Sequence, residues 1–177
     1  MKLLNPYLDL FRILESESEA LQLSARKKLI WAYSWAIPND EAIAALKEFS
    51  PLLELGAGTG YWAWLLRQSG ADILACDRNS VAPPHWTAVE PGDEKVVSRH
   101  SHRSLFLCWP SYQEPLAFEA LQAYSGQRVA YVGELNGRTA DDAFHRLLSE
   151  EYKLQREVII PVWPGYRDRL YFFQKKS

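Results

Sequence analysis

The sequence predicts an α/β protein, a doubly wound three-layer sandwich around a seven-stranded, mostly parallel sheet. Short apolar runs alternate with helical patterns from Pro51 to the C-terminus, and strands that alternate with helices build parallel sheets with right-handed crossovers. Of the 177 residues, 47% are hydrophobic and 24% are charged, which is the composition of a globular domain. Only a short turn separates the last two apolar runs, 158–162 and 170–173. Because a parallel crossover needs a dozen or more residues, the last strand is expected to be antiparallel.

Residues 1–50 are expected to form a helical extension that has no core of its own and packs on the domain of residues 51–177. A helix is predicted to begin at Asn39 or Asp40 and to end at Ser50-Pro51, because the residue before a proline avoids the helical region. The strands of the domain are predicted at residues 52–55, 73–76, 86–89, 105–108, 128–132, 158–162 and 170–173. Three helices are predicted in this domain: one begins at Tyr61, one covers residues 117–124, and one follows a cap at Thr139 or Asp141. A loop is predicted at Pro83-Pro84.

The composition excludes several classes of protein. Twenty Lys and Arg against 22 Asp and Glu give a net charge of -2, so no overall basic field attracts a polyanion. No run approaches the ~20 apolar residues of a membrane-spanning helix, and residues 1–11 make a poor signal peptide. Two cysteines, Cys76 and Cys108, are too few for a disulfide scaffold, and no metal site is predicted. A reducing, cytoplasmic compartment is therefore expected.

The most informative segment is the turn Glu54-Leu55-Gly56-Ala57-Gly58-Thr59-Gly60, where a short strand passes into a helix. Three glycines at alternate positions allow a sharp turn and a close approach of the backbone to a ligand. The free N–H groups at the start of the helix favour an electronegative group. Asp77 ends the next predicted strand, 21 residues after Gly56. A carboxylate at that place can accept hydrogen bonds from both hydroxyls of a ribose.

This turn and Asp77 together resemble the class I S-adenosylmethionine-dependent methyltransferases. Their first motif is an acidic residue, any residue and then Gly-x-Gly-x-Gly, and Glu54 to Gly60 match it at every fixed position. The resemblance covers residues 51–177 and implies the strand order 3-2-1-4-5-7-6. It implies that Gly56, Gly58 and Gly60 wrap the methionine and ribose of S-adenosylmethionine, that Glu54 orders its ammonium group and that Asp77 holds its ribose. Further cofactor-binding residues are expected to be Tyr33, Trp35, Ala57, Tyr61, Trp62, Arg78 and Cys108.

A dinucleotide-binding protein is the competing prediction. Its fingerprint is Gly-x-Gly-x-x-Gly, with the third glycine one position later than in this turn. That position is Tyr61 in this sequence. The chain is also short for a dehydrogenase that includes a substrate domain.

A methyl acceptor is expected at the carboxyl ends of the strands, where ligands bind in open α/β sheets. The fourth strand ends in Trp109-Pro110-Ser111-Tyr112. In amino-methylating members of the superfamily this segment is Asn or Asp, Pro, Pro and an aromatic residue. Pro110 and Tyr112 fit this pattern, but Trp109 replaces the amide or carboxylate. The departure argues against methylation of an exocyclic base amine or of glutamine.

An aromatic and acidic rim is expected to line the acceptor pocket. Its catalytic residues are predicted to be Trp109, Pro110, Tyr112 and Glu134, with Glu134 as a general base or as an orienting group. The aromatic residues of the rim are expected either to stack a planar acceptor or to enclose the sulfonium methyl, because a cation is favoured against aromatic faces; they are Tyr61, Trp62, Trp109, Tyr112 and Trp163. The structural alternatives are that Glu134 only caps a strand or helix, and that Trp62 or Trp64 only packs.

The predicted function is methyl transfer from S-adenosylmethionine to an unidentified acceptor, a small molecule or a protein rather than a nucleic acid. The alternative is a non-catalytic cofactor-binding or scaffold protein, and a nucleotide-binding oxidoreductase is a third hypothesis. Arg78, Arg167 and Arg169 are candidates to steer an anionic acceptor. The basic run Arg26-Lys27-Lys28 is interpreted as a solvated helix face.

Overall fold

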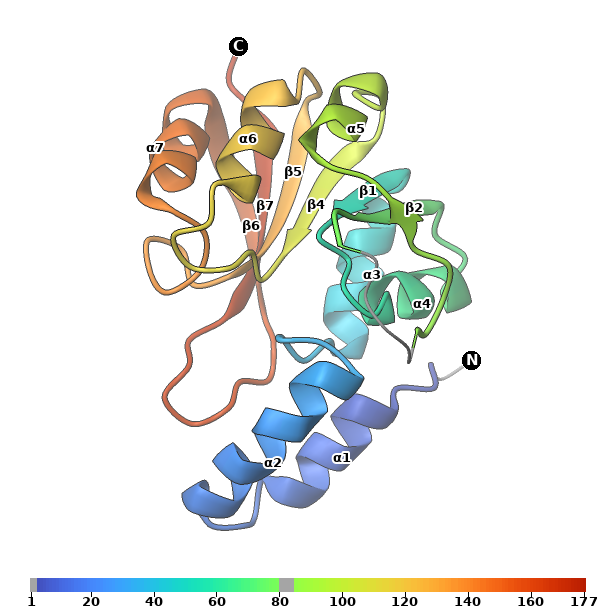
Figure 1. The fold of residues 1–177 in the computed structure, drawn as a ribbon, viewed down its shortest axis with the longest axis vertical. Helices are drawn as coiled ribbons and strands as arrows, with labels where there is room; N and C mark the ends of the chain where they lie inside the picture. Colours follow the sequence, from blue (N-terminus) through green and yellow to red (C-terminus); the bar gives the residue numbers. More distant parts are fainter. Residues whose placement is uncertain (1–2, 80–84) are drawn as a thin grey trace.

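A seven-stranded sheet forms the centre of the computed structural model, which describes residues 3–79 and 85–177 (Figure 1). The loop predicted at Pro83-Pro84 lies outside the described residues. The strands follow the order β3-β2-β1-β4-β5-β7-β6. Neighbouring strands are parallel except at β7, which runs antiparallel to both β5 and β6. The predicted fold class, strand order and antiparallel last strand are therefore confirmed.

Five strands lie close to their predicted positions. They are β1 (Leu52–Leu55), β2 (Ile73–Asp77), β4 (Ser104–Cys108), β5 (Arg128–Gly133) and β7 (Arg169–Lys175). The prediction of a strand at 86–89 was wrong, because β3 is only Glu90–Pro91. The backbone of 86–89 is used elsewhere: the N–H of Trp86 donates to the carbonyl of Thr59 in the glycine turn at 2.9 Å.

The bounds of the sixth strand were also predicted wrongly. Strand β6 is Tyr152–Ile159 instead of 158–162. It lies at the edge of the sheet, next to β7, and six of its eight residues are exposed, four of them polar. The period-two apolar pattern that identifies a half-buried strand is therefore missing from its first half.

The helices are α1 (Pro6–Leu14), α2 (Glu19–Ala32), α3 (Asp40–Glu48), α4 (Tyr61–Gln68), α5 (Glu94–Arg99), α6 (Leu116–Ala123) and α7 (Asp142–Glu151). Helix α3 begins as predicted, since Asn39 Oδ1 accepts the N–H of Ala42 at 2.9 Å. At α7 the cap is Asp141 and not Thr139, since Asp141 Oδ1 accepts the N–H of Phe144 at 2.8 Å. The short helix α5 was not predicted.

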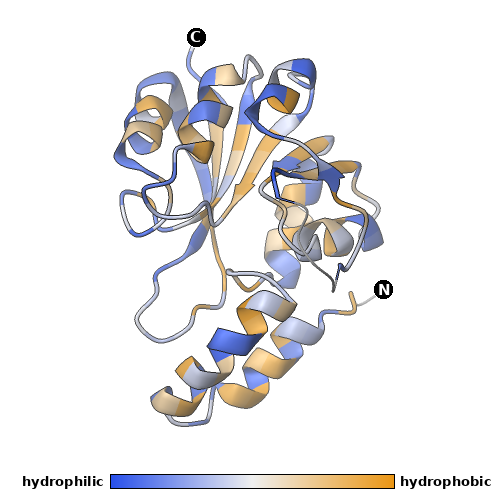
Figure 2. Ribbon diagram, in the orientation of Figure 1, coloured by the Kyte–Doolittle hydropathy of each residue, from blue (hydrophilic) through white to orange (hydrophobic). Residues whose placement is uncertain are grey.

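Different helices cover the two faces of the sheet. Helices α3 and α4 lie on one face, and α5, α6 and α7 lie on the other (Figure 1). Successive strand residues such as Leu52 and Leu53 belong to opposite buried clusters, as the alternation of side chains along a strand requires. Figure 2 shows the hydrophobic residues concentrated along the central strands.

Helices α1 and α2 lie side by side beyond the sheet, next to the loop that joins β6 to β7 (Figure 1). The start of α1 is bound to α4: the Tyr61 hydroxyl donates to Asn5 Oδ1 at 2.8 Å and accepts the N–H of Tyr7 at 3.1 Å. These buried hydrogen bonds hold the N-terminal helices at the end of the sheet where the glycine turn lies. Across the described residues, we find no helix whose length and apolar content would allow it to span a membrane.

Candidate active site

The turn between β1 and α4 has the conformation that its glycines permit. Gly56, Gly58 and Gly60 have φ angles of 80°, 55° and 73°, which lie in the left-handed region that favours glycine. A Cβ atom on Gly58 would meet nothing within 4 Å, whereas one on Gly60 would lie 2.9 Å from Val89 Cγ2. The turn therefore has open space at its middle and a close contact at its end.

Asp77 and the glycine turn are in direct contact. The N–H of Gly58 donates to Asp77 Oδ2 at 2.8 Å, and the N–H of Asn79 donates to Asp77 Oδ1 at 2.9 Å. Each carboxylate oxygen has a second lone pair for a further donor. Asp77 is thus oriented at the carboxyl end of β2, with capacity for one hydroxyl on each oxygen.

Glu54 is a buried acid in β1, two residues before the first glycine of the turn. Its side chain is almost fully buried, and within the described part of the chain its Oε2 atom has no hydrogen-bond partner. The pKa of Glu54 is raised to about 8, mainly by burial. The charge of Arg67 opposes this rise, and the charge of Asp77 adds to it. Most molecules therefore carry a protonated Glu54 at neutral pH.

Trp109 connects three parts of the chain at the carboxyl end of β4. Its φ angle of 52° is uncommon for a bulky residue. Its ring stacks on Trp35, with centroids 4.8 Å apart and planes inclined by 13°. Its Nε1–H donates to Asp168 Oδ1 in the β6–β7 loop at 3.0 Å. The N-terminal segment and that loop therefore meet at Trp109.

Asp168 is a candidate functional residue that the sequence interpretation missed. It is 4% exposed, and in residues 3–79 and 85–177 the indole of Trp109 is the one hydrogen-bond donor to its carboxylate. Burial raises the pKa of Asp168 to about 6, whereas the hydrogen bond from Trp109 lowers it. No local motif marks Asp168, because both its burial and its donor depend on tertiary contacts.

Hydrogen bonds within the protein occupy all the lone-pair positions of the Glu134 carboxylate, so none is left to accept a proton from a substrate. Its Oε1 accepts from Arg138 Nη2 at 2.8 Å and from the N–H of Arg167 at 2.9 Å. Its Oε2 accepts from Arg138 Nε at 3.0 Å and from the N–H of Arg138 at 3.3 Å. A carboxylate offers about four such positions, and the bonds from Arg138 lower the pKa of Glu134 despite its burial. These contacts favour the structural alternative, in which Glu134 fixes the β6–β7 loop.

The rings of Tyr61 and Trp62 lie in the core, with exposed fractions of 0% and 1%. Trp62 packs on Phe106 with ring centroids 5.8 Å apart. Tyr33 stacks on Tyr7, with centroids 4.8 Å apart, and its carbonyl accepts from the Thr59 hydroxyl of the glycine turn. The rings of Tyr61 and Trp62 therefore pack in the core of this structure, and their contact with a ligand stays a prediction.

Two of the predicted site residues, Arg78 and Trp163, have partners within the protein. Arg78 forms ion pairs with Glu94 at 2.8 Å and with Glu119 at 3.1 Å, so its charge is compensated by α5 and α6. Trp163 is buried and donates its Nε1–H to the hydroxyl of Tyr7 at 3.2 Å. Both side chains therefore contribute to packing between elements.

The other predicted residues remain near the edge of the sheet. The N–H of Ala57 donates to the carbonyl of Cys76 at 3.0 Å, which joins the turn to β2. Cys108 ends β4 as a free thiol, and burial raises its pKa well above the ordinary value. Pro110 is buried and its carbonyl accepts the N–H of Ala140 at 2.9 Å, whereas Tyr112 is 56% exposed.

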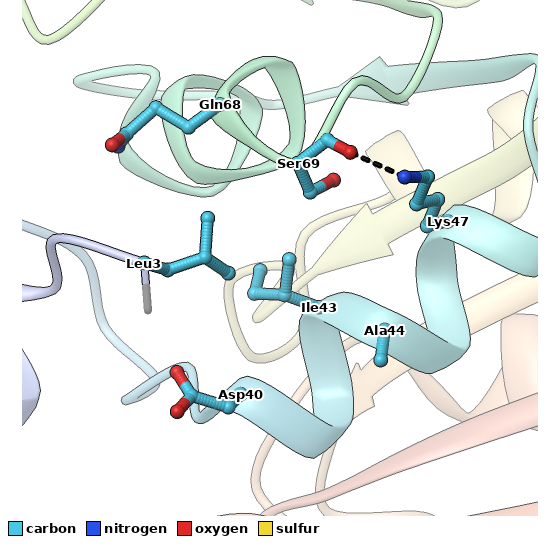
Figure 3. Close-up of a pocket in the computed structure, with 7 residues that line it drawn as sticks. All are labelled: Leu3, Asp40, Ile43, Ala44, Lys47, Gln68 and Ser69. Atoms are coloured by element: carbon cyan, nitrogen blue, oxygen red, sulfur yellow. Dashed lines mark hydrogen bonds between the residues drawn. The ribbon is translucent and has the colours of Figure 1, made fainter. Parts of the chain in front are cut away.

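A pocket of about 380 Å³ opens between α3 and α4, away from the glycine turn (Figure 3). Its lining residues are Leu3, Asp40, Ile43, Ala44, Lys47, Gln68 and Ser69. Ser69 follows the last residue of α4, and the eight residues of this helix separate the pocket from Gly60 by about 12 Å. The pocket is therefore not part of the site formed by Glu54, the turn and Asp77.

Solved structures with the same architecture were found, although no family model matches the chain. Magnesium protoporphyrin IX methyltransferase from Synechocystis PCC 6803, with bound S-adenosylhomocysteine, gives a TM-score of 0.51 at 11% identity, over 77% of this chain and 81% of that one. A mutant of MtNAS in complex with S-adenosylmethionine gives 0.55 at 12% identity, over 96% and 76%. The fold is that of the S-adenosylmethionine-dependent methyltransferases.

Two further similarities accompany this methyltransferase fold. The pyocyanin biosynthetic protein PhzM gives a TM-score of 0.52 at 14% identity, over 94% of this chain and 61% of that one. The ribosomal RNA large subunit methyltransferase M of Alkalilimnicola ehrlichii is 38% identical over 55 residues. That match spans 31% of this chain but only 15% of the length of the curated relative.

Proposed function

We propose that the protein transfers a methyl group from S-adenosylmethionine to a small molecule or to a group delivered by a protein partner. One observation carries the proposal. A turn of three left-handed glycines is hydrogen-bonded to the strand-end carboxylate of Asp77 and adjoins Glu54, a buried acid with an unpartnered oxygen among the described residues.

The residues of the turn fit this cofactor at three points. The open space at Gly58 lets the backbone approach the ligand closely. Asp77 has a free lone pair on each oxygen for the two ribose hydroxyls. Glu54 Oε2 lacks a donor, and the ammonium group of a bound ligand supplies one. When bound, S-adenosylmethionine supplies a methyl group that is electrophilic because it is attached to a sulfonium.

The residues beyond β4 would orient the acceptor and receive its proton. Alignment of the nucleophile with the methyl carbon is the main task of the protein in such a transfer. Asp168 is the carboxylate best suited to take up the proton that the acceptor loses, since its pKa is raised to about 6 and Trp109 occupies only one of its oxygens. Trp109 positions Asp168, and the exposed ring of Tyr112 is a candidate contact for the acceptor.

Calorimetric titration with S-adenosylmethionine and S-adenosylhomocysteine tests the proposal. We expect Asp77→Ala to weaken the binding of both compounds by about tenfold or more, a loss of at least ~1.4 kcal/mol. Asp142→Ala is the matched control, because Asp142 is exposed on α7. If the folded wild-type protein binds neither compound, the proposed function is wrong.

A non-catalytic cofactor-binding protein is the second candidate. It is favoured by Trp109, which replaces the polar residue of the amino-methylating pattern, and by the saturated contacts of Glu134. Incubation with cofactor radiolabelled on the methyl group, together with fractionated small molecules and proteins, separates the two candidates. Tight binding without label transfer to any fraction would support the second.

A further inference from the structure

Arg26 is a buried cation without a charged partner. It lies on α2, where it and Ile30 are the only buried residues, and it is 8% exposed. In the described part of the chain its Nε atom has no hydrogen-bond partner and no carboxylate lies within ion-pair distance of its guanidinium. Arginine is almost never buried in this way unless it is paired. The interpretation of the run Arg26-Lys27-Lys28 as a solvated face was therefore wrong for Arg26.

Three aromatic rings surround this guanidinium. Its Cζ atom lies 4.1 Å from the ring centroid of Tyr166, 5.5 Å from that of Trp35 and 6.0 Å from that of Trp109. Such contacts favour the cation, but they satisfy none of its five N–H donors. The donors remain available for an acceptor that arrives with a ligand.

Arg138 provides an internal comparison. Its Cζ atom lies 4.8 Å from the centroid of the same Tyr166 ring. Unlike Arg26, it donates to both oxygens of Glu134. Within the described residues, Arg26 therefore lacks the hydrogen-bonded anion that Arg138 has, although its charge acts at longer range to lower the pKa of Asp168.

The surrounding charges restrict what this anion can be. Trp109 contacts both Arg26 and Asp168: the guanidinium of Arg26 lies over its ring, and its indole N–H donates to the carboxylate of Asp168. A dianion such as phosphate would be repelled by Asp168, so a monoanion is favoured. The guanidinium fork matches the two oxygens of a carboxylate. The ring of Trp35 stacks on Trp109 and is itself 38% exposed, and the Cζ atom of Arg26 lies 5.5 Å from its centroid, so Trp35 offers a planar surface beside Arg26.

We propose that the acceptor is a small aromatic monocarboxylate, whose carboxylate binds to Arg26 and whose ring packs on the exposed ring of Trp35. The proposal rests on the proposed function, since it names the class of acceptor for the same site.

The test measures binding of benzoate, 1-naphthoate and indole-3-acetate to the full chain in the presence of S-adenosylhomocysteine. Tryptophan fluorescence and calorimetry serve as readouts, and the matched primary amides serve as uncharged analogues. We expect at least one carboxylate to bind about tenfold or more tightly than its amide, because a hydrogen bond between charged groups is stronger than one to a neutral group. Arg26→Met should abolish this preference, and Arg26→Lys should reduce it because lysine lacks the planar fork.

Lys27→Met is the matched control, because Lys27 is exposed on the same helix and the change in charge is the same. It should leave the preference for the carboxylate unchanged. The proposal is overturned if no carboxylate outcompetes its amide, or if Arg26→Lys and Lys27→Met have equal effects. It is also overturned if Arg26→Met weakens S-adenosylhomocysteine itself by about tenfold, since Arg26 would then hold the cofactor. Absence of S-adenosylhomocysteine binding by the wild type would instead contradict the proposed function.

Discussion

Binding of S-adenosylhomocysteine is expected to release a proton from Glu54. Burial raises the pKa of this carboxyl from 4.5 to about 8, so about 90% of molecules carry the proton at pH 7. The ammonium group of the ligand favours the ionised form once it lies beside Glu54 Oε2. Removal of the proton at pH 7 costs about 1.4 kcal/mol, because pH 7 lies about one unit below that pKa.

The expected magnitude follows from this linkage. If the pKa of Glu54 in the complex returns to its ordinary range near 4.5, binding at pH 7 releases about 0.9 protons. Affinity should then rise by about tenfold for each unit of pH between pH 5 and pH 7, and level off above pH 8. Calorimetry in pairs of buffers with different ionisation enthalpies measures the number of protons released.

Glu54→Gln is the control, because glutamine has the shape of the protonated side chain but does not titrate. The variant should show no proton release from this position and no steep dependence of affinity on pH. Any titration of the ligand's own ammonium group appears equally in both proteins and cancels in the difference. Equal proton release by the wild type and by Glu54→Gln would refute the reasoning.

Two further predictions concern the acids beyond β4. Asp168→Asn should stabilise the protein by up to about 3 kcal/mol at pH 7 and by little at pH 3. The pKa of Asp168 is raised from 3.8 to about 6 in the folded protein, so the wild type loses stability as the pH rises through this range and the variant does not. Urea unfolding measures the increase in the free energy of unfolding. Methyl transfer by the variant should fall. Glu134→Gln should lower the free energy of unfolding at pH 7 by about 1–3 kcal/mol. Because the pKa of Glu134 is lowered, this loss of stability should shrink as the pH falls below 4.5, the ordinary pKa of a glutamate. If the variant instead keeps its stability and transfers methyl groups more than about tenfold more slowly, Glu134 acts as the general base.

The sheet and its glycine turn could be predicted because their signals are local. Each parallel strand from β1 to β5, apart from β3, is a short apolar run that ends at a turn. The left-handed φ angles of Gly56, Gly58 and Gly60 are ones that glycine adopts without steric cost, so the three glycines indicated a sharp turn. The edge strand β6 lacked such a signal, because six of its eight residues are exposed and four of these are polar.

The roles of charged side chains could not be predicted, because burial and partners are set by distant contacts. Arg26 and Lys27 are neighbours in one basic run, yet the first is buried against Tyr166 and the second is exposed. Glu134 and Asp168 are both acids at the carboxyl edge of the sheet. Only the fold shows that Arg138 saturates the first, while the second receives a single indole donor.

Trp109 links the departure from the amino-methylating pattern to the proposed acceptor. In that pattern the residue after β4 supplies the polar group itself, but an indole has no acceptor atom. Here Trp109 adopts a φ of 52° and directs its N–H to Asp168. A carboxylate from the β6–β7 loop therefore lies beside the position that holds an amide or a carboxylate in the amino-methylating pattern. The same ring lies over Arg26, a cation from α2. The indole of Trp109 thus contacts an acid through its N–H and an arginine without an ion pair through its ring. Such a site suits an acceptor with a carboxylate and a separate nucleophile, rather than a neutral amide.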